Sequence, residues 1–205
     1  MSSTPTPTPT QRLNRREVVA QLLADRGELL VVAGLGAPAW DVNAAGNHPL
    51  AFPMWGGMGG AAMVGLGLAI AQPGRRVLVI TGDGEMLMGL GSLATIGVQR
   101  PANLSVVVLD NERYGETGMQ QTHTAAGVDL ASVAAACGFA SAVTVRTSAE
   151  VERLRAETHA GAGPLFAAVK VALDKLPLVL PPRDGAHLKN RFREALLGPR
   201  AHLQT

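Results

Sequence analysis

The sequence predicts a doubly wound α/β domain, in which a mainly parallel sheet carries helices on both faces. Short apolar runs, typical of buried parallel strands, alternate with helix-like segments along most of the chain. Glycine is frequent (24 residues) and aromatic residues make up only 3%, which favours a tightly packed α/β fold over a β-sandwich. With 47% hydrophobic and 17% charged residues, the 205-residue chain has enough apolar side chains for one large core.

The expected elements follow in order. Asn14 and Glu17 have the form of a capping box at the start of the first helix. Ser148 is expected to cap the helix at 148–159. Right-handed crossovers bring the carboxyl ends of the strands to one edge, where ligands of such folds bind. The helices are expected at 14–26, 57–71, 85–98, 129–137 and 148–159, and the strands at 29–33, 77–81, 104–109, 142–145 and 165–171.

Three segments are expected along the chain. Residues 1–11 are rich in proline and threonine and lack an apolar run, which predicts a disordered tail and not a signal peptide. Residues 12–175 form the domain, and residues 176–205 form a proline-rich and then basic arm with a short helix. The glycine-rich apolar stretch 54–71 is interpreted as a packed helix of small residues and not as a membrane span.

Composition also excludes several classes of function. The net charge is only +2, basic residues form no dense cluster and few aromatic residues are available for stacking, so no nucleic-acid partner is expected. The single cysteine, Cys137, rules out a disulfide framework and a cysteine-held zinc or iron–sulfur site within the chain. No membrane partner is expected, and a reducing cytoplasm is the expected location.

The segment Gly82-Asp83-Gly84 joins an expected strand to an expected helix. Such a turn usually binds an anion, so a carboxylate at its centre calls for a divalent cation between it and a phosphate. Asn111 follows the next strand and should lie close to Asp83 in space. Because Mg²⁺ prefers carboxylate, amide, carbonyl and phosphate oxygens, the sequence predicts a magnesium diphosphate site, where Gly82 and Gly84 let the backbone approach closely.

The whole stretch from 82 to 115, "GDGEMLMGLGSLATIGVQRPANLSVVVLDNERYG", resembles the fingerprint of thiamine diphosphate (TPP) enzymes. That fingerprint begins with GDG and ends in one or two asparagines a little under thirty residues later. Asn111 aligns with the metal-binding asparagine. Asp110 stands where the family often has a first asparagine, so it is a second candidate for the metal.

The resemblance implies further cofactor contacts. The loop "AGLGAPAW" (33–40) resembles the one that touches the diphosphate, and "MWGGMGGA" (54–61) resembles the one that supports the aminopyrimidine. Met58 would hold the cofactor bent, although ordinary core packing is the alternative. The implied cofactor-binding residues are Gly36, Ala37, Gly56, Met58, Gly82, Asp83, Gly84, Glu85, Asn111, Tyr114 and Gly115, and the implied metal-binding residues are Asp83, Asn111 and Arg113.

Decarboxylases of this family use two α/β domains. One (PP) binds the diphosphate and metal, and the other (PYR) grips the pyrimidine and supplies an activating glutamate. This chain resembles the PP domain alone. The loop "NERYGETGMQQTHT" (111–124) makes it most similar to the β subunits of sulfopyruvate decarboxylase and to the C-terminal half of phosphonopyruvate decarboxylase.

The resemblance therefore implies a TPP- and Mg²⁺-dependent carboxy-lyase subunit. It would release CO2 and an aldehyde from a small 2-oxo acid, together with a separate PYR-domain α subunit, in an α2β2 or larger assembly. Within the loop, Glu116 and His123 are the catalytic candidates. An equally weighted alternative makes His123 a solvated loop histidine.

Two alternatives to this function stay open. Carboligation, as in acetolactate synthases, uses the same motifs. A non-catalytic phosphate-binding or scaffold subunit belongs to another class, although the intact pair of Asp83 and Asn111 is unexpected for a decayed site. The 2-oxoacid:ferredoxin oxidoreductases also have separate PP-type subunits, but the lone cysteine argues against their clusters.

Overall fold

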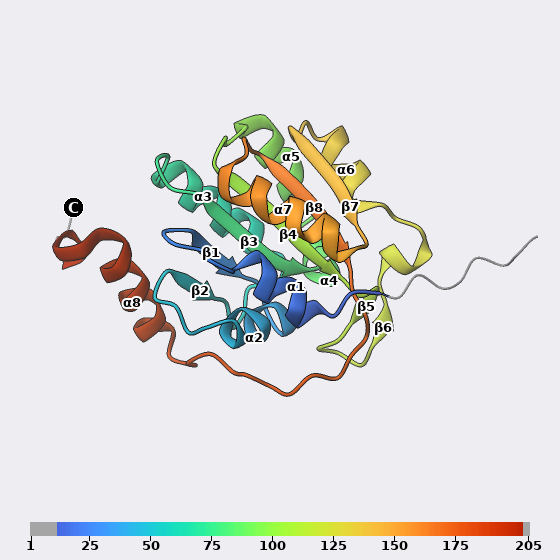
Figure 1. Cartoon of the computed structure of the whole chain (residues 1–205), viewed down its shortest axis with the longest axis horizontal. Helices are drawn as coiled ribbons and strands as arrows, with labels where there is room; N and C mark the ends of the chain where they lie inside the picture. The colour runs from blue at the N-terminus through green and yellow to red at the C-terminus, as the bar shows by residue number, and fades with distance from the viewer. Residues whose placement is uncertain (1–11, 203–205) are drawn as a thin grey trace, which may run out of the picture.

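A six-stranded sheet forms the centre of the molecule in the computed structural model, which describes residues 12–202 (Figure 1). All its neighbouring strands pair in parallel, in the order β2-β1-β3-β4-β8-β7. This arrangement confirms the predicted doubly wound parallel sheet. The strands are β1 (Leu30–Ala33), β2 (Ala51–Pro53), β3 (Val77–Gly82), β4 (Leu104–Asp110), β7 (Ser141–Val145) and β8 (Leu165–Lys170).

Helices cover both faces of this sheet, and each face has its own apolar core. The strands supply alternate side chains to the two cores, as the pleat of a strand requires. One face packs against α1 (Arg15–Leu22), α2 (Ala37–Ala44) and α7 (Ser148–Ala160). The other packs against α3 (Ala61–Ala71), α5 (Ser92–Gln99) and α6 (Leu130–Ala136).

Three helices begin within a few residues of the positions predicted from the sequence. Asn14 caps α1 by accepting hydrogen bonds from the backbone N–H groups of Arg16 and Glu17, and Asp129 caps α6 in the same way. The N-cap of α7 is Thr147, one residue before the expected Ser148, because Thr147 and Glu150 form the reciprocal capping box.

One helix and one strand around the main sheet were not expected from the sequence. The second half of the loop predicted at 33–40 begins α2 instead, which starts after Gly36 with a proline in its first turn. Strand β2 has only three residues and ends in Pro53, so it lacks the length and pattern that identify a strand. It lies at the edge of the sheet, where proline is tolerated.

The single helix expected over 85–98 is divided into α4 (Asp83–Met88) and α5. The break has a tertiary cause: a Cβ on Gly89 would collide with the backbone carbonyl of Gly59. The loop before α3 therefore presses directly on the end of α4. The same loop delays the start of α3 from the expected residue 57 to Ala61, since Gly57 and Gly59 have positive φ angles.

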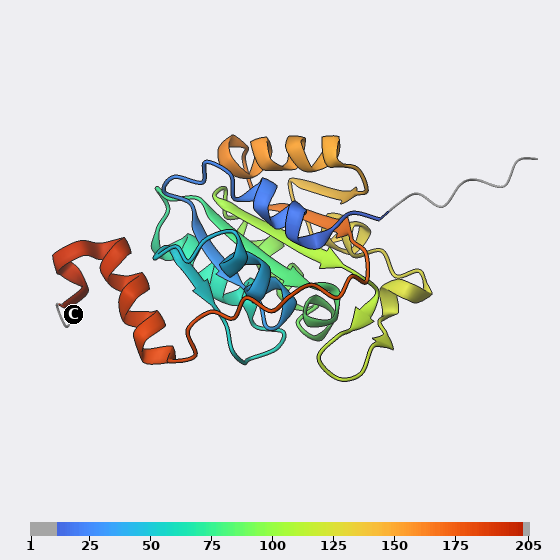
Figure 2. The same cartoon turned by 60° about the horizontal axis from the view of Figure 1, so that its bottom comes forward.

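The last part of the chain runs back across the domain (Figure 2). Residues 172–184 have no regular structure, and α8 (Gly185–Leu197) follows, capped by Asp184. Phe192 of α8 packs edge-on against Phe52 of β2, with ring centroids 5.9 Å apart. The helix within the arm was predicted. The predicted tail 1–11 lies outside the described residues.

Two short 3₁₀ helices, η1 (His123–Ala126) and η2 (Gly198–His202), complete the fold with the hairpin of β5 (Arg113–Tyr114) and β6 (Gln120–Gln121). The hairpin lies within the loop that follows β4. Between residues 12 and 202, no helix is long and apolar enough to cross a membrane.

Candidate functional site

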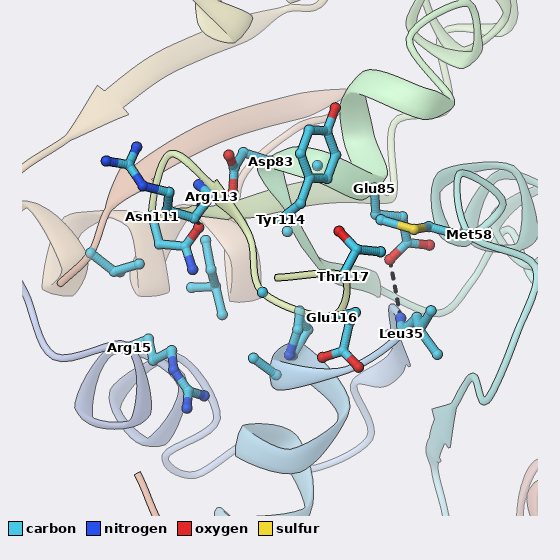
Figure 3. Close-up of a pocket in the computed structure, with 17 residues that line it drawn as sticks. Arg15, Leu35, Met58, Asp83, Glu85, Asn111, Arg113, Tyr114, Glu116 and Thr117 are labelled. Atoms are coloured by element: carbon cyan, nitrogen blue, oxygen red, sulfur yellow. Dashed lines mark hydrogen bonds between the residues drawn. The ribbon is translucent and has the colours of Figure 1, made fainter. Parts of the chain in front are cut away.

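A pocket opens at the carboxyl ends of β3 and β4 and beside the first turn of α2 (Figure 3). Its position is the one at which parallel α/β sheets bind ligands. Most of the predicted site residues line it, which confirms that segments distant in sequence meet at this edge. Those residues are Ala37, Met58, Gly82, Asp83, Gly84, Glu85, Asn111, Arg113, Tyr114, Gly115 and Glu116.

Asp83 is the central acid of the pocket. It follows β3 directly and its residue surface is only 2% exposed. Its Oδ2 accepts hydrogen bonds from the hydroxyls of Thr122, at 2.6 Å, and Thr124, at 3.4 Å. Burial raises the pKa of Asp83 to about 6; the Thr122 hydrogen bond opposes this shift, and the nearby negative charge of Asp110 adds to it.

Asp110 faces away from the pocket. Its Oδ1 accepts from Thr124 Oγ1 at 2.8 Å and from the Glu112 backbone N–H at 3.1 Å. Its Oδ2 accepts from Lys170 Nζ at 2.6 Å. With both oxygens engaged, Asp110 is tied into the structure, and it is not among the residues that line the pocket.

Asn111, in contrast, lies on the pocket side of the same strand end. Its Oδ1 accepts one hydrogen bond, from the Arg113 backbone N–H at 2.9 Å. A carbonyl oxygen has a second lone pair, so this amide can also bind a cation. The geometry favours Asn111 over Asp110 as the partner of Asp83.

The oxygens at this edge fit Mg²⁺. Asp83 is a buried carboxylate, and no Lys, Arg or His side chain of the described chain forms an ion pair with it. A buried charge without a partner is costly, and a hard cation held by Asp83, Asn111 and phosphate oxygens would remove that cost. Within residues 12–202 no group of three His, Cys, Asp or Glu residues offers another metal site.

The first turn of α2 provides the anion side of the pocket. Gly36 is the N-cap residue, has a φ of 75° and offers no side chain to cap the helix. Free backbone N–H groups and the helix dipole at such a start suit a phosphate. Ala37 lines the pocket and Gly36 lies immediately beside it, with the Glu116 side chain against its Cα.

Glu85, a predicted cofactor-binding residue, lies where three segments of the site meet. It lines the pocket, but its buried carboxylate accepts from Leu35 N–H at 3.1 Å, Ala61 N–H at 3.3 Å and Thr81 Oγ1 at 2.8 Å. These bonds join the loop after β1, the start of α3 and the end of β3. Gly34 is required beside it, since a Cβ there would collide with Glu85 Oε2. The carboxylate therefore braces the pocket.

The hairpin after β4 forms the outer wall of the pocket. Tyr114 of β5 lies so close to Gly84 that a Cβ on Gly84 would collide with its ring. The last glycine of the Gly82-Asp83-Gly84 turn is thus needed for close packing against Tyr114. The tip of the hairpin, including Glu116, is exposed.

Besides Gly36, which lies beside the pocket lining, two predicted residues do not reach the pocket. Gly56 is exposed in the loop before α3, and His123 is exposed between Thr122 and Thr124, whose side chains are buried. The sequence reasoning selected the histidine and missed the threonines. No local pattern marks them, because Thr122 caps the 3₁₀ helix η1 and Thr124 lies within it.

Arg15 was also missed. Its buried guanidinium forms an ion pair with the fully buried Asp41 of α2, and Arg16 Nε binds the same carboxylate at 3.0 Å. Arg15 also lines the pocket. The two arginines therefore attach α1 to α2, whose first turn lines the pocket.

Comparison with known proteins agrees with this geometry. Residues 35–169 match the family described as "Thiamine pyrophosphate enzyme, C-terminal TPP binding domain". The chain is 36% identical to the sulfopyruvate decarboxylase subunit beta of Methanothermobacter thermautotrophicus, over 91% of this chain and 97% of that one. It is 37% identical to the phosphonopyruvate decarboxylase of Streptomyces viridochromogenes, over 96% of this chain and 49% of that protein.

Solved structures share the fold. The benzoylformate decarboxylase of Polynucleobacter necessarius superposes with a TM-score of 0.68 over 87% of this chain and 36% of that one, at 21% sequence identity. That identity supports the architecture alone. The match to the TPP-binding domain and the extent of the relationship to the decarboxylase subunits show that this chain belongs to the TPP-dependent decarboxylases, as their TPP-binding domain.

Proposed function

We propose that this chain is the β subunit of a cytoplasmic TPP- and Mg²⁺-dependent decarboxylase. Its substrate is a small 2-oxo acid with a second anionic group, similar to sulfopyruvate or phosphonopyruvate, and its products are CO2 and an aldehyde. The observation that carries the proposal is the pair of Asp83 and Asn111 at the ends of adjacent strands, with the start of α2 across the pocket.

Different residues of this chain would bind the metal and the diphosphate of the cofactor. Asp83 and Asn111, with a backbone carbonyl near Arg113, would hold Mg²⁺, and the first turn of α2 would bind the diphosphate. Bound TPP supplies a positively charged ring that accepts electrons as CO2 leaves. Met58 lines the pocket from the loop before α3 and belongs to neither apolar core, which supports a role against the cofactor.

Glu116 is the proposed residue for contact with the reacting groups. It lines the pocket from the exposed hairpin tip, where it can reach a substrate without rearrangement of the core. His123 stays a weaker proposal, since its side chain is exposed outside the pocket. The preference for a doubly anionic substrate has its support in the names of the relatives and in Arg113, a cation in the pocket lining.

The partner would be a PYR-domain α subunit that supplies the activating glutamate, in an α2β2 or larger assembly. The relatives that this chain spans almost completely are called subunit beta. Exposed apolar side chains on the helices next to the pocket support an interface there. They are Met63, Val64 and Ile70 of α3 and Met88 of α4, of which Met88 is 60% exposed.

The test reconstitutes the chain with and without the PYR-domain chain of its own organism. Both samples receive TPP, Mg²⁺ and sulfopyruvate, phosphonopyruvate or pyruvate, while CO2 and aldehyde are measured. We expect aldehyde from a doubly anionic substrate in the mixture only. Robust decarboxylation by this chain alone would overturn the subunit assignment, and acetolactate formed from pyruvate without aldehyde would establish carboligation instead.

A further inference from the structure

Three strands that are neighbours in the sheet, β3, β4 and β8, have charged side chains at or just after their carboxyl ends. Asp83 follows β3, Asp110 ends β4 and Lys170 ends β8, and Asp110 and Lys170 are direct partners in the strand register. The three therefore stand in a row from the pocket outward. Asp110 is only 1% exposed, and the Lys170 side chain is 14% exposed, so the row is largely screened from water.

Hydroxyl groups lie between the two carboxylates. Lys170 Nζ donates to Asp110 Oδ2 at 2.6 Å, and Thr124 Oγ1 donates to Asp110 Oδ1 at 2.8 Å. Thr122 Oγ1 donates to Asp83 Oδ2 at 2.6 Å, and Thr124 Oγ1 also lies 3.4 Å from that oxygen. Each hydroxyl has only one hydrogen, so the 2.9 Å approach of the two hydroxyl oxygens is a packing contact when both donate to the carboxylates. Asp110, held by the Lys170 ammonium group, thus fixes Thr124, which lies against both the Thr122 hydroxyl and Asp83.

The charge on Lys170 has a specific task in this row. Two carboxylates, Asp83 and Asp110, are buried near each other, and an unpaired buried carboxylate is costly. Lys170 neutralises Asp110 and draws it away from the pocket, so Asp110 can hold Thr124 without competing for a cation. The Glu112 carboxylate also contacts Lys170, at 3.3 Å, and Arg12 in turn binds Glu112 at 2.7 Å.

We propose that Lys170 and Asp110 are positioning residues for the metal site, acting on Asp83 through Thr124 and Thr122. This inference rests on the proposed Mg²⁺ and TPP site. Groups that hold a metal ligand in place typically contribute 10- to 100-fold to metal affinity. Neither residue lines the pocket, so neither is expected to touch the cofactor or the substrate.

The test measures Mg²⁺ binding in the enzyme assembled with its partner subunit. Calorimetric titration at saturating TPP gives the Kd for Mg²⁺, and activity at rising Mg²⁺ gives kcat separately. For Lys170→Met we expect the Kd for Mg²⁺ to rise roughly 10- to 100-fold, with kcat largely recovered at saturating Mg²⁺. Lys170→Arg should restore most of the affinity, and Lys189→Met, at an exposed lysine of α8, serves as the matched control.

A second pair of variants keeps the test informative if Lys170→Met does not fold. Thr124→Val removes the hydroxyl with little change in shape, and Thr124→Ser retains it, so only the valine should weaken Mg²⁺ binding. An unchanged Kd for Mg²⁺ in folded Thr124→Val and Lys170 variants would overturn the inference. If the unaltered enzyme itself binds no Mg²⁺ with TPP, the proposed function fails instead, so the two failures are distinguishable.

Discussion

The two walls of the pocket are built in different ways. The wall at the ends of β3 and β4 contains the buried Asp83, held by threonines, and behind it Asp110 is held by Thr124 and Lys170. The opposite wall is the exposed hairpin tip around Glu116 and the loop before α3, which contains Gly56 and Met58. The difference supports the proposal that this chain would complete the metal and diphosphate side itself, while a partner would complete the other side.

The largest expected effect belongs to the buried wall. Asp83→Asn should abolish Mg²⁺-dependent retention of TPP, with a loss beyond the roughly 10- to 100-fold typical of residues that only position a metal ligand. The cofactor-free variant should be at least as stable as the unaltered protein, because a desolvated carboxylate has been removed. Calorimetry and thermal unfolding check both statements, and Asp25→Asn on the exposed surface is the matched control.

Substitution of Met58, in the exposed wall, should change the catalytic rate more than the stability of the fold. Met58→Ala should lower kcat roughly 10- to 100-fold, because a small displacement of reacting groups is costly, while stability changes by less than about 1 kcal/mol. Met54→Ala is the matched comparison, since Met54 packs against the core and should lose about 2 kcal/mol of stability. A large loss of stability with unchanged kcat in Met58→Ala would favour core packing.

The buried wall should also make metal binding depend on pH, because it contains Asp83. The pKa of Asp83, about 6 in the folded protein, lies above its unfolded value, so its protonated form is favoured by folding. Protonated Asp83 therefore stabilises the cofactor-free protein fully below about pH 4, and this stabilisation is lost as the pH rises through 6. Mg²⁺ binds the ionised form, so the stabilisation by Mg²⁺ and TPP should fall as the pH drops through 6.

Thermal unfolding between pH 5 and 8, with and without Mg²⁺ and TPP, measures this difference. The pH dependence should disappear in Asp83→Asn. A stabilisation by the ligands that stays constant across this range in the unaltered protein would show that Asp83 does not bind the metal.

The smallest expected effect concerns the contact between the arm and the open wall. Trp55 Nε1 donates to the Pro182 carbonyl at 2.7 Å, and the Arg183 guanidinium lies 5.6 Å from the Trp55 ring centroid. Trp55→Phe keeps an aromatic ring but removes a hydrogen bond worth about 1 kcal/mol. We expect TPP affinity to fall by up to about fivefold, as measured by calorimetry. No change would mean that the arm does not position this loop.

The buried wall was also the part that the sequence predicted best. Strand patterns placed Asp83 and Asn111 at one edge because apolar runs and glycine turns are local signals. The break between α4 and α5 depends on the contact of Gly89 with Gly59, and Thr122 and Thr124 acquire their partners only when their loop folds over β3 and β4. Such features depend on contacts between distant segments, which the local pattern does not contain.

The point at which the chain enters the domain has a consequence for how such enzymes are assembled. Leu13 pairs with Val171, and its N–H donates to the Lys170 carbonyl at 3.3 Å, so the described chain begins at the ligand-binding edge of the sheet. The matching family is described as a C-terminal domain. A domain fused ahead of residue 12 would be tethered beside the pocket, and a short tether of this kind gives a high effective concentration. The same architecture is therefore compatible with separate subunits and with a single polypeptide.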